Sequence, residues 1–131
     1  MAAEENLERL LQALDPQLDP ETYVFCSVSK PAHLLLAATT PLATFREEEG
    51  LSLVLTQKQA SQHKLDSSPA FRRITLGVQS SLAAVGLTAE VTRCLAGHGI
   101  SANVIAAYYH DHILVPVDRA DAALEALKTL C

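Results

Sequence analysis

The sequence of 131 residues contains no tryptophan and only three cysteines. The cysteines are odd in number, lie far apart and form no C-x-x-C pair, so neither structural zinc nor a disulfide framework is expected. Cys26 falls in a strand-like pattern and Cys94 in a helical one. Both are therefore predicted to be small core hydrophobes and not nucleophiles.

Long apolar runs and basic clusters are also missing. No stretch approaches the roughly 18 uninterrupted apolar residues of a membrane span, and the N-terminal MAAEENLERL is acidic where a signal peptide would be basic and then apolar. We therefore expect a cytoplasmic protein with no membrane partner. The formal net charge of −5 argues against a nucleic-acid partner, because phosphate-binding surfaces need clustered Lys and Arg.

Apolar residues, by contrast, are plentiful. Hydrophobic residues make up 49% of the chain and charged residues 19%, which predicts a folded globule with a genuine core. The length fits one domain, or two very small interlocked modules, and excludes a large multi-domain enzyme.

The first half of the chain alternates between helical and extended patterns. Leucines at helical spacing predict an opening helix, and β-forming residues, alternation and turn residues predict the elements that follow. We expect helix over 4–14, strand over 22–29, a short helix over 31–41 with Pro31 in its first turn, a hairpin meeting at Glu49-Gly50, and helical turns over 57–65. A linker-like cluster of polar residues and proline follows at 66–69, so the predicted modules are residues 1–66, with the leading helix, and 67–131.

The second half has stronger periodicity. Alternating Ile74, Leu76 and Val78 predict a strand. The segment 81–99 carries a helical apolar stripe and closes on two glycines. Two antiparallel strands are expected over about 100–109 and 112–117, and a final helix with Asp118 as its N-cap.

The order of elements predicts an α+β fold with a twofold repeat. Each half has the order strand, helix, strand, strand, helix, which is a ferredoxin-like βαββα module lacking its last strand. Two complete modules would need eight strands, and the sequence indicates six. Either strands are shared between two interlocked modules, with antiparallel sheets and helices on one face, or another copy of the chain completes the sheet edges. The second alternative suggests a homodimer.

Three stretches carry a resemblance to a known family. FREEEGLSLVL, SSLAAVGLTAEV and NVIAAYYHDHILVP resemble the small stand-alone ACT-domain proteins of bacteria and, less closely, the ACT repeats of the cytosolic arginine sensor. The resemblance extends from about Tyr23 to Leu130. It implies ferredoxin-like regulatory modules that bind a free amino acid at an interface between two modules. It departs from the family in that the sequence shows no attached enzyme or DNA-binding domain.

The turn QSSLAAVGL is the first candidate for a ligand site. The first N–H groups of a helix have no intrahelical partner and form the positive end of its dipole, so they can bind a carboxylate. Ser80, Ser81 and Leu82 are the predicted contacts, although the two serines could equally be plain N-caps. Gly86 and Leu87 are the next candidates, because the missing side chain of Gly86 allows a ligand or a neighbouring backbone to approach closely.

The strand that begins ISANVI supplies the other candidates. Ser101, Asn103 and Val104 match positions that ACT domains use to line their sites, so the resemblance implies that they contact the ligand. Asn103 could accept from an ammonium group. The alternative is that it bonds local backbone as a polar residue at the start of a strand.

The corner His110-Asp111-His112 could bind a metal or a proton. Successive side chains on an extended chain point to opposite faces, so the three cannot easily converge on one ion. A solvated hairpin corner fits better, and a contribution to an interface or ligand rim stays open beside metal or acid–base chemistry. His33, His63 and His98 are scattered without zinc-ligand spacing.

Three functions remain. The first is a sensor that binds an amino acid or a similar small molecule, without catalysis, cofactor or metal. The second is an assembly module that regulates a protein partner by contact. The third, a small enzyme using the His-Asp-His corner or Cys94, has no supporting catalytic motif.

Overall fold

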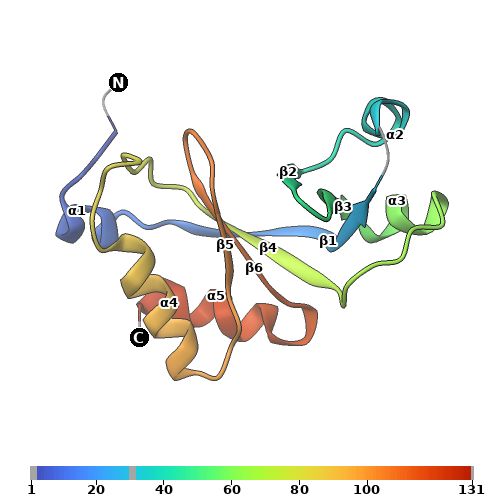
Figure 1. The fold of residues 1–131 in the computed structure, drawn as a ribbon. Helices are drawn as coiled ribbons and strands as arrows, with labels where there is room; N and C mark the ends of the chain where they lie inside the picture. The colour runs from blue at the N-terminus through green and yellow to red at the C-terminus, as the bar shows by residue number, and fades with distance from the viewer. Residues whose placement is uncertain (1–2, 30–31, 131) are drawn as a thin grey trace. The chain divides into compact units, whose positions relative to one another are not determined.

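The computed structural model describes residues 3–29 and 32–130. The chain divides into two compact units, which are described separately below. Unit 1 comprises Met1–Pro20 and Arg72–Cys131, and unit 2 comprises Glu21–Phe71. Figure 1 labels the elements, which are α1 (Leu7–Gln12), β1 (Pro16–Val28), α2 (His33–Thr39), β2 (Ala43–Glu47), β3 (Gly50–Thr56), α3 (Gln57–Gln62), β4 (Phe71–Leu76), α4 (Leu87–Gly97), β5 (Asn103–Ala106), β6 (Asp111–Pro116), the 3-10 helix η1 (Val117–Arg119) and α5 (Ala120–Thr129).

The strands follow the order β2-β3-β1-β4-β6-β5. Strand β1 has 13 residues and runs through both units, with Pro16–Pro20 in unit 1 and Glu21–Val28 in unit 2. Strand β1 is therefore shared between the two units, and completion of the sheet edges by another copy of the chain stays a prediction. The predicted module boundary near residues 66–70 stays a prediction. Helix α1, which the sequence assigned to the first module, belongs to unit 1 together with residues 72–131.

Unit 1 contains the ferredoxin-like order β4-α4-β5-β6-α5, with the first part of β1 as its fourth strand. The N–H of Gly77 donates to the carbonyl of Asp15 at 2.9 Å, just beyond the ends of these two strands. Strands β5 and β6 are antiparallel, with Asn103 opposite Leu114 and Ala106 opposite Asp111. The predicted ferredoxin-like α+β fold and the antiparallel pair are confirmed.

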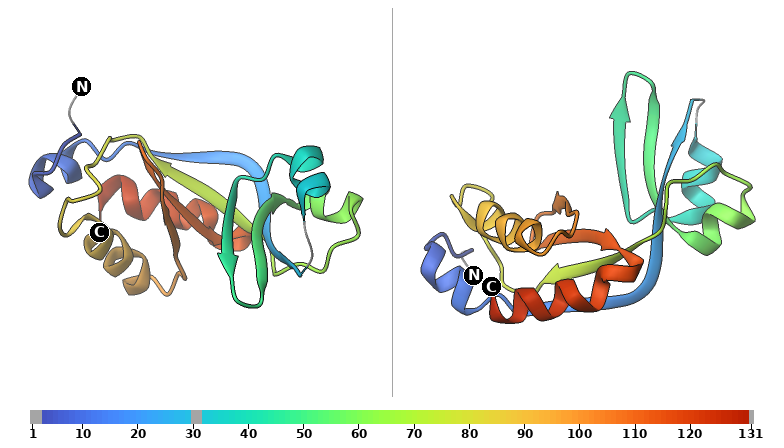
Figure 2. Two further views of the ribbon diagram at one scale, coloured as in Figure 1. Left: turned by 45° about the horizontal axis from the view of Figure 1, so that its top comes forward. Right: turned by 90° about the horizontal axis from the view of Figure 1, so that it is seen from below.

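The core of unit 1 lies between its helices and one face of its strands. Figures 1 and 2 show α4 and α5 along the same side of β4 and β6. Alternation along the strands directs Ile74, Leu76, Ile113 and Val115 into this layer, where they meet Val91 and Leu95 of α4, Ala123 and Leu127 of α5, and Leu10 and Leu14 from the N-terminal segment.

Unit 2 is built on a hairpin of β2 and β3, visible in Figure 2. Glu47 pairs with Gly50 at the predicted turn, and β3 pairs in antiparallel fashion with β1 from Tyr23 onward. Helix α3 begins with a capping box between Thr56 and Gln59. The core cluster of this unit consists of Val24, Cys26, Leu53, Leu55 and Ala60, with Leu35 and Leu36 of α2 packed against it.

Three sequence predictions were wrong in detail. Helix α4 begins at Leu87 and not near Ser81. Asp118 lies in the 3-10 helix η1, and Arg119 takes the N-cap position of α5. Cys26 is a buried free thiol as expected, but Cys94, also buried, is disulfide-bonded. The prediction that Pro31 lies in the first turn of a helix falls outside the described residues.

Candidate ligand site

The loop between β4 and α4, residues 77–86, forms the candidate site in unit 1. Its chain turns at Ser81, whose carbonyl accepts from the N–H of Ala84 at 3.0 Å and whose hydroxyl accepts from the N–H of Ala83 at 3.1 Å. A serine side chain that bonds its own turn in this way competes with helix formation. The loop therefore continues to Gly86, which is the N-cap of α4 with φ of +104°.

A recess of about 80 Å³ lies between this loop and the end of the β5–β6 hairpin. It is lined by Ser80, Ser81, Leu82, Ala84, Leu87, Thr88, Ala106 and Asp111. Four of the predicted site residues thus meet here, namely Ser80, Ser81, Leu82 and Leu87. The hydroxyl of Ser80 donates to Oδ2 of Asp111 at 3.1 Å, so the recess contains a hydrogen-bonded carboxylate.

The start of helix α4 contributes to the same recess. Leu87 and Thr88 both line it and are the first two residues of the helix. Their N–H groups precede the first intrahelical hydrogen bond, in which Glu90 donates to the carbonyl of Gly86. The recess therefore combines one carboxylate with the positive end of a helix dipole.

The remaining predicted residues lie elsewhere. Val104 packs with Leu87 and Ile113 around a small hollow of about 10 Å³ in the core. Asn103 is exposed, and its Nδ2 donates to the carbonyl of Leu114 at 3.4 Å, as the local-backbone alternative expected. Ser101 is exposed in the segment before β5. Neither Ser101 nor Asn103 lines the recess, and their contact with a ligand stays a prediction.

A second hollow, called the outer cavity below, adjoins the recess. It has a volume of about 250 Å³ and is lined by Ala3, Gln79, Ser80, Ser81, Leu82, Tyr108 and Tyr109. The two tyrosine rings meet edge to face, with centroids 4.9 Å apart. The sequence reasoning missed both tyrosines, although two adjacent aromatic residues in a chain with 5% aromatic residues were a usable signal.

The N-terminal segment holds the loop from outside. Glu4 forms a parallel bridge with Ser80. Its N–H donates to the carbonyl of Gln79 at 3.0 Å, and its carbonyl accepts from the N–H of Ser81 at 2.8 Å. A Cβ built on Gly86 would lie 3.0 Å from Cδ2 of Leu7 in α1. Glycine at position 86 therefore allows the N-terminal helix to approach the start of α4.

The His-Asp-His corner separates as alternation predicts. The N–H of Ala107 donates to the carbonyl of His110 at 3.0 Å and closes the turn, Asp111 lines the recess, and Nδ1 of His112 lies 3.0 Å from Oγ1 of Thr75. Within the described residues, no group of three His, Cys, Asp or Glu side chains is placed to hold a metal ion. Asp111 lines the recess, and the alternative that the corner contributes to a ligand rim stays a prediction.

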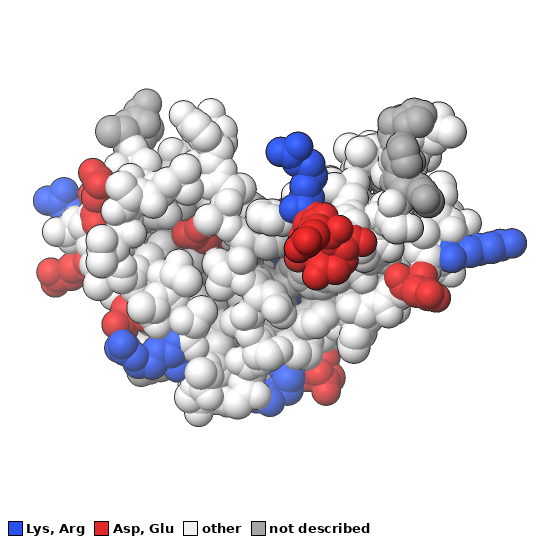
Figure 3. Space-filling view, in the orientation of Figure 1, with Lys and Arg blue, Asp and Glu red and all other residues white. Residues whose placement is uncertain are grey.

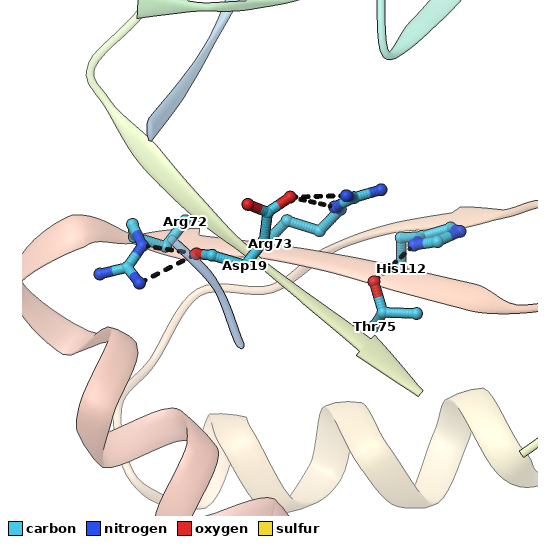
Figure 4. Close-up of polar contacts among 5 residues, drawn as sticks. All are labelled: Asp19, Arg72, Arg73, Thr75 and His112. Atoms are coloured by element: carbon cyan, nitrogen blue, oxygen red, sulfur yellow. Dashed lines mark hydrogen bonds and ion pairs between the residues drawn. The ribbon is translucent and has the colours of Figure 1, made fainter. Parts of the chain in front are cut away.

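Figure 4 shows polar contacts among five residues of β1, β4 and β6, namely Asp19, Arg72, Arg73, Thr75 and His112. Nε and Nη2 of Arg73 donate to Oδ2 of Asp19 at 3.1 and 2.5 Å, while Arg72 donates to the carbonyl of Asp19. Burial, and then the positive charges of Arg73 and His110, lower the pKa of His112 below its ordinary value of 6.5, and Asp111 opposes this shift.

On the face drawn in Figure 3, the described Lys and Arg side chains lie singly or in small groups, several of them beside Asp or Glu, and form no broad basic region. Each described helix, in 3–29 and 32–130, is too short or too polar to cross a membrane. The described residues of unit 1 thus form a ferredoxin-like α+β domain with a candidate small-molecule site.

Comparison with known families agrees with this class. Two ACT-domain models match the chain, one over residues 2–72 and the other over residues 67–129. The chain therefore belongs to the ACT-domain family, and the resemblance found from its motifs is confirmed. ACT domains are regulatory modules that bind small ligands. No match is found among curated proteins.

Solved structures show the same fold. A protein of unknown function from Vibrio cholerae, described as a possible transport protein, is 52% identical, with a TM-score of 0.86 over 95% of this chain and 94% of that one. A protein from Agrobacterium tumefaciens is 18% identical, with a TM-score of 0.72 over 89% and 88%. The ligand-free regulatory subunit of aspartate kinase from Thermus thermophilus is 12% identical, with a TM-score of 0.69 over 91% and 98%.

Proposed function

We propose that the protein is a regulatory ACT protein that binds a free amino acid in the recess and has no catalytic activity. The observation that carries the proposal is the meeting of Asp111 with the start of α4 in one hollow. An α-amino acid is a zwitterion, so a receptor needs an acceptor for its ammonium group and donors for its carboxylate. Asp111 supplies the acceptor, and the N–H groups of Leu87 and Thr88 supply the donors.

The charge of the recess supports a zwitterion over a simple anion. Asp111 is the charged residue among those that line it, and its carboxylate would repel phosphate or a dicarboxylate near the helix start. A ligand with a positive group beside a negative group satisfies both ends of the site. Ser80 holds the Asp111 carboxylate in place from the loop.

The edge strands of the sheet support a regulatory role through assembly. Strands β2 and β5 form the edges of the sheet, and their unpaired backbone groups can pair with another copy of the chain. We propose a homodimer on this ground, with a regulated protein partner that responds to the bound amino acid. The regulatory subunit of aspartate kinase shares the fold, which supports this role. A cytoplasmic location remains a prediction from the acidic N-terminal sequence.

A thermal-shift screen of the amino acids tests the proposal. A ligand that binds only the folded protein raises the melting temperature by mass action, so at least one amino acid at millimolar concentration should raise it by several degrees. Asp111→Asn should weaken binding at least tenfold, because a charge-assisted hydrogen bond is worth about 1.5–3 kcal/mol. Asp121→Asn, on the exposed side of α5, is the matched control.

Two results would contradict the proposal. Absence of a shift with every amino acid would favour the assembly module that acts by contact alone. Undiminished binding by Asp111→Asn would show that the ligand lies outside the recess.

A further inference from the structure

We infer that the outer cavity is the side-chain subsite of this ligand, and that Tyr108 and Tyr109 make the protein select amino acids with a large, uncharged side chain. The inference rests on the proposed binding of an amino acid in the recess and adds its class. Four observations on unit 1 support it.

The first observation is that the two hollows are neighbours. Ser80, Ser81 and Leu82 line both the recess and the outer cavity, so the two hollows lie side by side along this turn. The recess has about 80 Å³ and the outer cavity about 250 Å³. Sites that enclose a small molecule usually have about 300 Å³ or more. The recess alone therefore has room for little more than the ammonium and carboxylate groups, and the side chain must extend into the outer cavity.

The second observation is the chemistry of the wall. Tyr108, Tyr109, Leu82 and Ala3 present apolar surface, and Gln79, Ser80 and Ser81 present polar groups without charge. Among the described residues that line the outer cavity, none is Asp, Glu, Lys or Arg. A charged ligand side chain would lose water there without gaining an opposite charge, which is unfavourable. A small side chain would leave the tyrosine rings uncovered.

The third observation is the exposure of the apolar groups. Tyr108 is 78% exposed, Tyr109 61% and Leu82 71%. Large apolar side chains that gather on a surface mark binding sites more often than isolated ones do. These three side chains come from two loops that line one cavity. A ligand side chain placed over them would remove their apolar surface from water.

The fourth observation is that the tyrosines lie in a turn closed by a backbone hydrogen bond. Their turn is closed by the hydrogen bond from Ala107 to the carbonyl of His110 at 3.0 Å. Asp111 directly follows this turn and is bonded to Ser80. The aromatic wall and the ammonium acceptor are therefore held on the same few residues of backbone, which fixes the distance between the two parts of the ligand site.

The test measures affinity by titration calorimetry on the full chain with three sets of amino acids. Gly and Ala represent small side chains, Leu, Met and Phe large uncharged ones, and Asp, Glu, Lys and Arg charged ones. We expect the large uncharged set to bind roughly tenfold to a hundredfold tighter than the small set, as complete burial of such a side chain allows. The charged set should bind no better than the small set.

Variants assign the preference to the tyrosines. Tyr108→Ser and Tyr109→Ser, singly and together, should reduce the preference for large over small side chains to less than about threefold, because they remove most of the apolar surface that the ligand side chain would cover. Leu34→Ser is the control, because Leu34 is 76% exposed on α2 of unit 2 and belongs neither to the lining of the outer cavity nor to an edge strand. Asp111→Asn should instead weaken every amino acid by a similar factor.

The outcomes are distinguishable. If Gly and Ala bind as tightly as Leu and Phe, or if charged amino acids bind tightest, the inference is wrong and the proposed function stands. If the tyrosine variants keep the full preference and change only the oligomer mass in sedimentation velocity, the tyrosines form an interface between copies and the inference is also wrong. If no amino acid binds, the proposed function itself fails.

Discussion

The N–H of Ser81 donates to the carbonyl oxygen of Glu4 at 2.8 Å. This bond joins the N-terminal segment to the loop that lines both the recess and the outer cavity. A reciprocal bond runs from the N–H of Glu4 to the carbonyl of Gln79 at 3.0 Å. The first residues of the chain therefore fix the position of the ligand loop, and one backbone N–H of that loop is already satisfied before any ligand arrives.

Substitution of Glu4 by proline tests this role. Proline lacks the N–H that bonds Gln79, so Glu4→Pro should lower the free energy of unfolding by about 0.5–1.5 kcal/mol, the usual net value of one hydrogen bond. Amide hydrogen exchange at Ser81 should also become faster, since the paired segment would open more often. Urea denaturation and exchange measured by NMR give the two quantities.

Glu4→Ala is the control for this change. It removes the Glu4 carboxylate, which accepts from the N–H groups of Glu5 and Asn6, and keeps the backbone N–H. Equal exchange at Ser81 in the proline and alanine variants would show that the backbone bridge does not hold the loop.

The pH dependence of stability should depend on His112. Its pKa is lowered in the folded protein, first by burial and then by Arg73 and His110. As pH falls below 6.5, the unfolded chain takes up a proton at this position before the folded protein does. The free energy of unfolding should therefore fall as pH decreases from 6.5 through the lowered pKa of His112. The contribution of neutral His112 to stability is fully present only above pH 6.5.

Urea denaturation between about pH 5 and 8 measures this effect. We expect His112→Gln to show a smaller loss of stability on acidification than the unmodified protein. His63→Gln, at the exposed C-cap of α3, serves as the control and should keep the original slope. A slope that is the same with and without His112 would exclude this residue as its source.

Periodicity was enough to predict most elements of the fold, but it missed part of β1. Residues 16–20 were not predicted to form strand, and they include Pro16 and Pro20, which lack a backbone N–H. The pairing of β3 with β1 begins at Tyr23, so residues 16–20 lie beside β4 at the edge of the unit 1 strands, where a missing N–H does not break a ladder. The pairing partner, and hence the tolerance for proline, depends on a segment far along the chain and cannot be seen locally.

Only the part of the candidate site that depends on neighbouring residues in the sequence was predictable. Ser80, Ser81 and Leu82 follow a clear strand and precede an apolar helical stripe, so their place at a strand-to-helix junction was visible. Asp111 was placed on a hairpin corner, but its hydrogen bond to Ser80 depends on the arrangement of two strands in the sheet. Residues 82–85 favour helix by composition, and tertiary contacts of Ser81 and Gly86 outweighed that preference.

Gly86, the N-cap of α4, should tolerate a side chain poorly. Its φ of +104° lies where residues with a Cβ are strained, and an added Cβ would lie 3.0 Å from Cδ2 of Leu7. Gly86→Ala should therefore lower the free energy of unfolding by about 1–3 kcal/mol. The same helix provides a control in Gly97, where an added Cβ meets nothing within 4 Å. Gly97→Ala should leave stability unchanged or raise it by up to ~1 kcal/mol. Equal effects of the two substitutions, measured by urea denaturation, would mean that the α4 start is not strained and that α1 can move away from it without loss.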